Sequence, residues 1–477
     1  MRVALIHPAG SNFVPGKRDV TVVANRMPPL GILGMASVLE REGHDVVVHD
    51  CLGPRAPKGM KANVRAVLDA RPDLVGFSAT TSAFLDAYDM ASAIKEARPS
   101  VLTVFGGVHV SAVGGALLGR FLAIDCLVVG EGELTLAELV QGRPLREIDG
   151  LVWRDGEEIV VNAPRALAPD LDSLPMPAYE KLEGFPRGYA LPPFSYVRSP
   201  GATLVTSRGC VYRCSYCDRS VFGRGFRYNS AEHVYEHMRL LRTRFGVRHV
   251  NVYDDLFTTN RARIARLCGM LADRPLGLRF NCAVRVGHTD DELLGMLKEA
   301  GCLMVSVGIE SGDPALLERH KTGVGLDEVR DTVARIQAKG IRAKGLFMMG
   351  LPGETEAAIA RTSDFIMSLG LDDMNMSKFT PFPGAPVWET IREEGTFDED
   401  WRLMNCLNFV FVPKGIESKE RLDLLYNRHV KRFYCDPAWR AKLRGRLWQH
   451  RATLWRMLVH LPSFLAAKRH FEPGRSP

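Results

Sequence analysis

The stretch ATLVTSRGCVYRCSYC, residues 202–217, joins an apolar run typical of a strand to three closely spaced cysteines. Cys210, Cys214 and Cys217 offer soft thiolates at short spacing, which favour soft metals or an iron–sulfur cluster. A fourth nearby cysteine would indicate tetrahedral zinc or a fully ligated cluster, but none follows before Cys268. Three thiolates on a cubic cluster leave one iron open to a further ligand. Two alternatives are a three-cysteine zinc site completed by histidine, and three free thiols.

This stretch begins a series of β-α units between residues 201 and 385. Ser230 precedes one amphipathic helix, and Thr289 precedes another with Glu292 three residues on, which predicts a capping box. Six units are fewer than the eight of a closed barrel, so we expect an open, partial (β/α)6 barrel with its chemistry at the carboxyl ends of the strands. The predicted strands are Ala202–Thr206, His249–Tyr253, Leu278–Val286, Leu303–Ile309, Ala343–Met349 and Met374–Phe379.

Residues 1–140 also alternate strand-like and helical stretches, the latter including Gly31–Glu42 and Ala83–Ala97. Continuous apolar runs are typical of strands buried on both faces, and β-α alternation predicts a Rossmann-like, doubly wound parallel sheet. Ligands of such sheets bind at the carboxyl ends of the strands. The glycines found there either let a ligand approach the backbone or only close tight turns. The predicted strands lie in RVALIH (2–7), DVVVHD (45–50), DLVGFSA (73–79), VLTVFGG (101–107) and CLVVGEG (126–132).

Residues 141–200 are predicted to be a connector, and 386–477 a helical, basic C-terminal region. Asp155-Gly156 lies between two strand-like runs and predicts a β-hairpin. LAPDLDSLPMPAYE, residues 167–180, is rich in proline and turn residues, so we place the boundary between the first domain and the barrel there.

Composition excludes several classes of protein. The chain has 477 residues, 46% hydrophobic and 25% charged, which argues against a disordered chain, a disulfide mini-protein and a collagen repeat. No apolar run reaches the about 18–20 residues that span a bilayer, and the N-terminal run is too short for a secretion signal. We therefore expect a cytoplasmic protein, in which the seven other cysteines, such as Cys126, Cys282 and Cys302, are small buried apolar residues.

The net charge of +7 is concentrated at the C-terminus, where residues 431–477 contain eleven Lys or Arg and two acidic residues. The rest of the chain is nearly neutral, so no nucleic-acid partner is predicted. Trp448 and Trp455 are seven residues apart among leucines and arginines, a pattern typical of a basic amphipathic helix. Such a helix either contacts the inner face of the membrane peripherally or packs its apolar stripe on the barrel.

With these motifs in place, the chain resembles the radical S-adenosylmethionine (SAM) enzymes. The C-x-x-x-C-x-x-C motif, with aromatic Tyr216 before its last cysteine, resembles their signature. The first 140 residues resemble the cobalamin-binding domain that precedes the barrel in one branch of this superfamily. The resemblance covers about residues 1–385 and rests on Pro29–Gly31, Gly106–His109, Gly130–Glu133, Asn251–Asn260, Arg285-Val286, Gly308–Gly312, Lys321–Gly323 and Gly345–Thr355.

The resemblance implies three cofactors: a [4Fe-4S] cluster held by the three cysteines, SAM and cobalamin. Arg285 is a candidate for the SAM carboxylate because a guanidinium fork matches it, and the acidic residues are candidates for its amino and ribose groups. The alternatives are helix caps for the aspartates and a surface ion pair for Arg285. The implied SAM contacts are Tyr216, Asp254, Asp255, Arg285, Glu310, Gly350 and Glu354.

The cobalamin resemblance has one departure. The Asp-x-His-x-x-Gly motif that supplies a histidine to cobalt is absent, and residues 7–12 read HPAGSN. We therefore assign none of His7, His44, His49 and His109 as a cobalt ligand. The implied cobalamin contacts are Gly10, Ser78, Thr80, Gly106, Gly107, His109, Gly130, Glu131 and Gly132.

The expected activity is cleavage of SAM to a 5′-deoxyadenosyl radical, followed by modification of an unactivated carbon, with methyl transfer as the leading hypothesis. An oxidative cyclisation or rearrangement, as in anaerobic magnesium-protoporphyrin IX monomethyl ester cyclases, is the alternative. A third hypothesis is a cobalamin-binding sensor without turnover. The expected partners are a small, hydrophobic substrate and an electron donor such as flavodoxin or ferredoxin.

Overall fold

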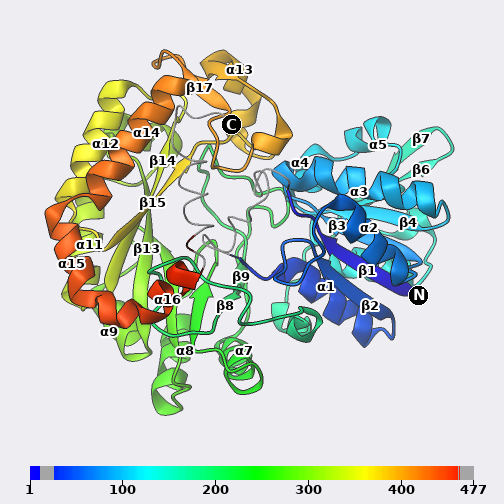
Figure 1. Ribbon diagram of the computed structural model, residues 1–477, viewed down its shortest axis with the longest axis horizontal. Coiled ribbons are helices and arrows are strands. Elements are labelled where there is room, and N and C mark those ends of the chain that lie inside the picture. Colours follow the sequence, from blue (N-terminus) through cyan, green and yellow to red (C-terminus); the bar gives the residue numbers. More distant parts are fainter. Residues whose placement is uncertain (11–25, 460, 462–477) are drawn as a thin grey trace.

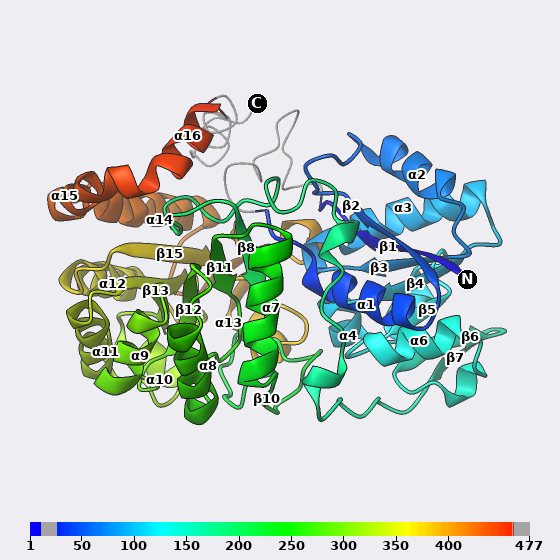
Figure 2. The ribbon, with the colours of Figure 1, turned by 90° about the horizontal axis from the view of Figure 1, so that it is seen from below.

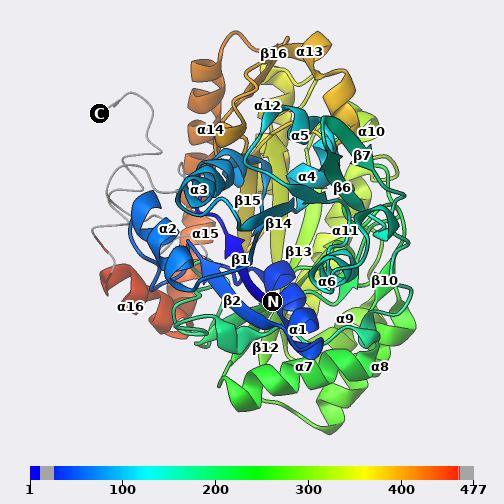
Figure 3. The same cartoon turned by 90° about the vertical axis from the view of Figure 1, so that its right-hand side faces the viewer.

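The chain forms two large sheets, each with its own helices, that lie side by side (Figure 1). The computed structural model describes residues 1–10, 26–459 and 461. Ser11 and Asn12 of the HPAGSN stretch and most of the chain after Val459 therefore lie outside the described residues. Seen from the side of the N-terminal sheet, that sheet and its helices lie in front of the barrel strands (Figure 3).

The N-terminal sheet has the order β2-β1-β3-β4-β5-β6-β7, and its first five strands are parallel. Two separate cores, one containing side chains of α1 and α6 and the other side chains of α2 to α5, cover its two faces. The predicted doubly wound parallel sheet is confirmed. Its elements are β1 (Arg2–His7), α1 (Leu30–Arg41), β2 (Asp45–Asp50), α2 (Met60–Asp69), β3 (Leu74–Ser78), α3 (Phe84–Ala97), β4 (Leu102–Gly106), α4 (Val108–Val113), α5 (Ala116–Arg120), β5 (Cys126–Val128) and α6 (Glu133–Val140).

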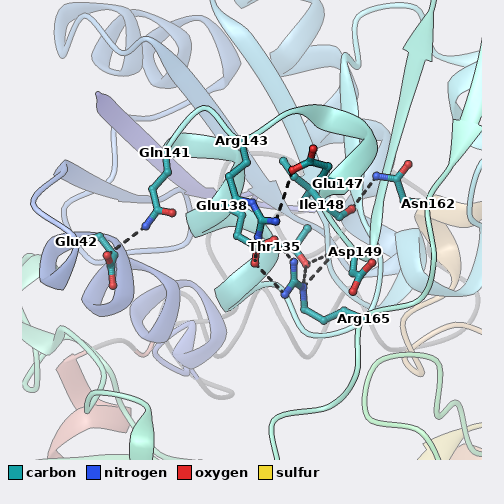
Figure 4. Close-up of polar contacts among 10 residues, drawn as sticks. All are labelled: Glu42, Thr135, Glu138, Gln141, Arg143, Glu147, Ile148, Asp149, Asn162 and Arg165. Carbon is teal, nitrogen blue, oxygen red and sulfur yellow. Dashed lines mark hydrogen bonds and ion pairs between the residues drawn. The ribbon is translucent and has the colours of Figure 1, made fainter.

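The predicted hairpin is present as β6 (Leu151–Asp155) and β7 (Glu158–Val161), and it extends the N-terminal sheet antiparallel to β5. The chain beyond it is held to α6 by Arg165, whose Nε donates to Thr135 Oγ1 at 2.7 Å and whose guanidinium pairs with Glu138 (Figure 4). The first part of the predicted connector is therefore structurally part of the N-terminal sheet.

The second sheet has the order β15-β14-β13-β12-β11-β8, all parallel, and β8 and β15 are unpaired edges. This confirms the predicted open, six-stranded partial barrel. A small ladder of β9 (Ser207–Arg208) and β10 (Arg227–Tyr228) follows β8. The other elements are β8 (Gly201–Leu204), α7 (Ala231–Arg244), β11 (His249–Val252), α8 (Arg261–Asp273), β12 (Arg279–Arg285), α9 (Asp291–Glu299), β13 (Cys302–Glu310), α10 (Pro314–His320), α11 (Leu326–Ala338), β14 (Arg342–Met349), α12 (Glu356–Ser368) and β15 (Asp373–Lys378).

One of the two predicted helix starts needs correction. Ser230 caps α7 as predicted, since its side chain accepts a hydrogen bond from the His233 backbone N at 3.1 Å. The cap of α9 is Asp290, whose Oδ1 accepts from the Leu293 backbone N at 2.8 Å, and not Thr289. Either residue type can cap a helix, and here the aspartate stands one residue closer to the first turn.

The C-terminal region is only partly the helical segment that the sequence predicted. A hairpin of β16 (Gly395–Phe397) and β17 (Phe411–Pro413) follows the short helix α13 (Ile391–Glu394). Within this part, Trp401 is buried against the N-terminal core, and Figure 1 shows the segment (orange) reaching towards α4. The helices proper are α14 (Lys419–Tyr434), α15 (Pro437–Arg446) and α16 (Arg451–Val459), with the 3-10 turn η8 (Leu447–His450) between the last two. Within the described residues, no helix is both long and apolar enough to cross a bilayer.

Candidate active site

Two adjoining cavities lie where the two sheets meet. One, of about 150 Å³, runs along the carboxyl ends of β1, β3, β4 and β5, the edge at which a sheet of this strand order binds ligands. The other, of about 210 Å³, is lined from β9 and from residues that follow β11, including Tyr253 and Asp255. Gly31, Glu133, Arg208 and Phe222 line both cavities, which therefore adjoin; together they are the shared space between the two large sheets.

The cysteine loop follows β9, and Arg208 and Phe222, which flank the loop in the chain, line this space. Cys210, Cys214 and Cys217 are half-buried and form no disulfide. Burial and the neighbouring thiols raise the pKa of Cys217 to about 12, and burial raises that of Cys210. Ligation must therefore displace their protons, as in any thiolate site. Gly209 is required before the loop because its φ is +87° and a Cβ there would lie 2.2 Å from the Gly225 carbonyl oxygen.

Arg285, at the carboxyl end of β12, is fixed against the cysteine loop. Its guanidinium stacks on the Tyr212 ring at 3.7 Å, its Nη1 lies 3.9 Å from Cys214 Sγ, and its Nη2 donates to the Thr322 carbonyl at 2.7 Å. The side chain is buried and, within the described chain, pairs with no carboxylate. The alternative of a surface ion pair is therefore wrong for Arg285.

Glu310, at the carboxyl end of β13, faces the same loop. Its φ of +71° is unusual for a residue with a side chain, and such strain is typical of functional positions. Lys321 Nζ holds it at 2.8 Å and also donates to the Gly308 carbonyl at 2.7 Å. Tyr216 lies near Glu310: after burial, the charge of Glu310 is the largest cause that raises the pKa of Tyr216. The structure therefore brings Tyr216, Arg285 and Glu310 together around the cysteines.

Asp254 is used inside the protein rather than at the cavity. It is buried, and its two oxygens accept from the Thr206 backbone N and Oγ1, both at 2.5 Å. Burial raises the pKa of its carboxyl in spite of these hydrogen bonds. Asp255, the next residue, instead lines the cavity and accepts from the Gly209 backbone N at 3.1 Å.

Glu354 also has an internal role. Its Oε2 accepts from the backbone N of Gly350 at 2.5 Å and of Leu351 at 3.3 Å, and burial raises the pKa of its carboxyl to about 8. Gly350 has a φ of +96°, so the pair holds the turn after β14. Neither residue lines the shared space.

Most of the predicted cobalamin contacts line the smaller cavity, namely Ser78, Gly106, Gly107, Gly130, Glu131 and Gly132. Gly107 must lack a side chain because its φ is +100° and a Cβ would meet the Ala79 carbonyl oxygen at 2.8 Å. Gly10, Thr80 and His109 do not line this cavity. The His109 ring is buried between Phe84 and Trp401, and burial lowers its pKa to about 4, so it is a neutral core residue.

An ion-pair cluster that the sequence patterns did not predict joins the β9–β10 ladder to the N-terminal sheet. Arg208, two residues before Cys210, pairs with Glu133 at 2.6 Å and Glu131 at 3.3 Å, and Arg227 pairs with Glu131 at 2.5 Å. All four side chains are mostly buried. Glu131, predicted as a cobalamin contact, is thus held by two arginines of the barrel region. No local pattern could reveal a pairing of residues that lie 75 to 96 positions apart.

Known proteins share these features. The family models described as "Radical SAM superfamily" and "B12 binding domain" match residues 204–366 and 16–140. An "Uncharacterized methyltransferase PH0819" of Pyrococcus horikoshii is 31% identical over 443 residues, which is 92% of this chain and 93% of the relative. The chain belongs to the cobalamin-binding radical SAM enzymes.

Two further similarities agree with this family. The anaerobic magnesium-protoporphyrin IX monomethyl ester cyclase of Cereibacter sphaeroides is 25% identical over 463 residues, 92% of this chain and 71% of the cyclase. The solved structure of the radical SAM methyltransferase TsrM from Kitasatospora setae, with cobalamin and a [4Fe-4S] cluster bound, superposes with a TM-score of 0.64 at 24% identity. It covers 82% of this chain and 74% of TsrM, and shows that the fold is shared.

The cofactors of this radical SAM enzyme are SAM, a [4Fe-4S] cluster and cobalamin. The residues present fit them: three thiols on one loop, and an apolar, glycine-lined cavity at the sheet edge where a side chain on Gly107 would clash. Among the described residues, no three His, Cys, Asp or Glu side chains converge on a single metal ion.

Proposed function

We propose that this enzyme transfers a methyl group to an unactivated carbon of a small, hydrophobic molecule. The observation that carries the proposal is the shared space between the two sheets. The glycine-lined cavity forms one part of it, and Arg208 and Phe222, which flank the cysteine loop in the chain, line both parts. A carbon held there would be within reach of both cofactors. The names of the relatives from Pyrococcus and Kitasatospora support methyl transfer.

Each group of residues has a proposed task. Cys210, Cys214 and Cys217 hold the cluster. Arg285 binds the SAM carboxylate, because it is buried, stacked on Tyr212 and pairs with no carboxylate among the described residues. When bound, the cluster and cobalamin supply reductive cleavage of SAM to a 5′-deoxyadenosyl radical and a transferable methyl group.

The remaining SAM contacts are proposed with the same geometry in view. Glu310 and Asp255 present carboxylates for the amino and ribose groups, and Tyr216 lies near both Glu310 and Cys214. Asp254, Gly350 and Glu354, which the resemblance also implied, are left out because their polar atoms are used within the protein.

A second candidate is oxidative cyclisation of a hydrophobic substrate, with flavodoxin or ferredoxin as the electron donor in either case. The similarity to the Cereibacter cyclase over 92% of this chain favours it. The two activities differ in the fate of the methyl group, since only the first consumes a second SAM as a methyl donor.

The test is anaerobic reconstitution with iron, sulfide and cobalamin, followed by SAM carrying a trideuterated methyl group and a reductant. Methyl transfer predicts S-adenosylhomocysteine in addition to 5′-deoxyadenosine, and deuterated methylcobalamin by mass spectrometry. This readout needs no knowledge of the substrate. Formation of 5′-deoxyadenosine without S-adenosylhomocysteine, and without deuterium label in cobalamin, contradicts methyl transfer and favours the cyclase activity.

A further inference from the structure

The amino ends of the barrel strands, opposite the cysteine loop, carry two adjoining cavities rich in arginine. The larger, of about 550 Å³, is lined by Arg198, Arg242, Arg248 and Arg451 with Val197, Ser199 and Gly277. The smaller, of about 310 Å³, contains Arg187 and Arg456 and shares Ser199 with the first. No acidic residue lines either cavity. This face of the barrel therefore concentrates positive charge.

The arginines of these cavities bond to carbonyl groups rather than to carboxylates. Arg198 Nη1 donates to the Gly277 carbonyl at 2.9 Å, and Arg242 Nε donates to that of Leu276 at 3.1 Å. Arg456 Nη1 donates to the Leu191 carbonyl at 2.8 Å, while its Nε and Nη2 are buried without a hydrogen-bond partner. In the described part of the chain none of the lining arginines forms an ion pair, so their charge is uncompensated.

Exposed apolar side chains stand beside these arginines. Trp448 in η8 and Trp455 in α16 are 78% and 69% exposed, and Leu458 and Val459 are 66% and 55% exposed. Trp455 and Val459 line the smaller cavity, and the Arg451 guanidinium lies over the Trp448 ring at 5.4 Å. Figure 2 shows α15 and α16 along one side of the barrel sheet. Clustered exposed apolar residues mark an interaction site.

We propose that this arginine–tryptophan face, formed by Arg198, Arg242, Arg248, Arg451, Trp448 and Trp455, docks on the surface of an anionic phospholipid bilayer. Guanidinium groups match phosphate in charge and in planar geometry. Tryptophan is enriched at the membrane–water interface, where its apolar ring and polar N–H are both accommodated. The face thus combines the two attractions that hold peripheral proteins on membranes.

An acidic partner protein would pair with the arginines but would not explain the two exposed tryptophans. The face also lies at the amino ends of β8 and β11, whereas the cysteine loop lies beyond the carboxyl end of β8. An electron donor bound here would stand at the wrong end of the barrel. Docking through this face leaves the shared cavity clear of the bilayer plane and keeps the enzyme beside a source of hydrophobic molecules.

The test is vesicle flotation of the full chain in about 0.1 M salt, with phosphatidylcholine alone or with about 30% phosphatidylglycerol. We expect binding to the anionic vesicles at least tenfold tighter than to the neutral ones, and loss of binding as salt is raised. Trp448→Ala/Trp455→Ala and Arg248→Glu/Arg451→Glu are each expected to weaken binding at least tenfold. All four residues are exposed, so thermal unfolding and SAM cleavage are expected to be unchanged.

The matched control is Leu122→Ala/Arg65→Glu, which changes a 78% exposed leucine after α5 and an exposed arginine of α2 and should bind as the wild type does. Equal binding to neutral and anionic vesicles, or no binding, overturns the proposal. So does binding that the face variants leave intact while removal of residues 462–477 abolishes it. Capture of an acidic flavodoxin that the face variants abolish, without vesicle binding, assigns the face to a protein instead.

Discussion

The cysteine-loop region and the arginine–tryptophan face, at opposite ends of the barrel sheet, treat charge in opposite ways. At the carboxyl ends, Glu310 is held by Lys321 and Arg208 by Glu133, and these side chains are largely buried. At the amino ends, arginines such as Arg248 and Arg451 are exposed, and no carboxylate of the described chain pairs with them. Charges that are paired inside the protein build a rigid cofactor site, whereas unpaired charges at the surface are available to an outside partner.

The largest effect on stability is expected at the ion pairs that join the two sheets. Glu131→Gln leaves Arg208 and Arg227 short of a partner in a mostly buried position, and breaking such a pair costs about 3–5 kcal/mol. We expect a lower unfolding temperature and lower cobalamin retention after gel filtration. Asp155→Asn, which removes the exposed partner of Arg146, is the control and should cost less than about 1 kcal/mol. Similar effects of the two variants on the unfolding temperature would contradict a larger contribution of the buried ion pairs to stability.

The next effect concerns Arg285, a buried arginine at the carboxyl end of β12 that pairs with no carboxylate of the described chain. Arg285→Lys keeps the charge but loses the planar fork, and loss of one preorganised contact typically lowers the rate by about 100-fold. The measurement is 5′-deoxyadenosine formation, with iron content as a check that the cluster is retained. Arg279→Lys, at the amino end of the same strand, should behave as the wild type. Wild-type cleavage by Arg285→Lys would remove the proposed carboxylate contact.

Glu354 is a buried acid that forms no ion pair with another described residue. Its pKa of about 8 lies above the ordinary 4.5, so the folded protein keeps a proton that the unfolded chain loses between these values. Wild-type stability should therefore fall by about 1 kcal/mol per pH unit through this window because of this group. Glu354→Gln lacks the titration. Denaturant unfolding at pH 5, 6 and 7 should show the variant gaining on the wild type as pH rises, and a constant difference would contradict the assignment.

The smallest effect is expected at the start of α9. Asp290→Ala removes the helix cap and should cost about 1 kcal/mol in the free energy of unfolding. Thr289→Val should be neutral or stabilising, because the Thr289 hydroxyl is buried without a hydrogen-bond partner. If Thr289→Val lowered the free energy of unfolding more than Asp290→Ala, Thr289 would be the helix cap, as the sequence pattern predicted.

Local patterns predicted much of the fold. Every predicted strand of both sheets is present, because buried parallel strands are continuous apolar runs, and the cysteine loop lies at the strand end where it was expected. Of the seven cysteines predicted to be buried, Cys126, Cys268, Cys282 and Cys302 are buried, whereas Cys51 and Cys406 are half-buried and Cys435 is exposed. The domain boundaries and the cytoplasmic location stay predictions.

Sequence patterns did not predict the contacts between segments that are far apart in the chain. The pairing of Arg208 with Glu133, and the burial of Trp401 beside His109, depend on how the two sheets pack. Patterns also could not separate Asp254, which bonds to Thr206 inside the protein, from Asp255, which lines the cavity. Adjacent residues of one motif differ in role because the chain turns between them, and only the three-dimensional arrangement shows which way each side chain faces.

Spectroscopy of the anaerobically reconstituted protein tests whether the three cysteines hold a cubic cluster with one open iron. Mössbauer and EPR spectra should show about four irons per chain in one cubic cluster, and the EPR signal of the reduced cluster should shift when SAM binds the open iron. Cys214→Ala should lose the cluster, whereas Cys435→Ala, which removes an exposed thiol, should keep it. A cluster that survives in Cys214→Ala, or an EPR signal that SAM leaves unchanged, would contradict the account.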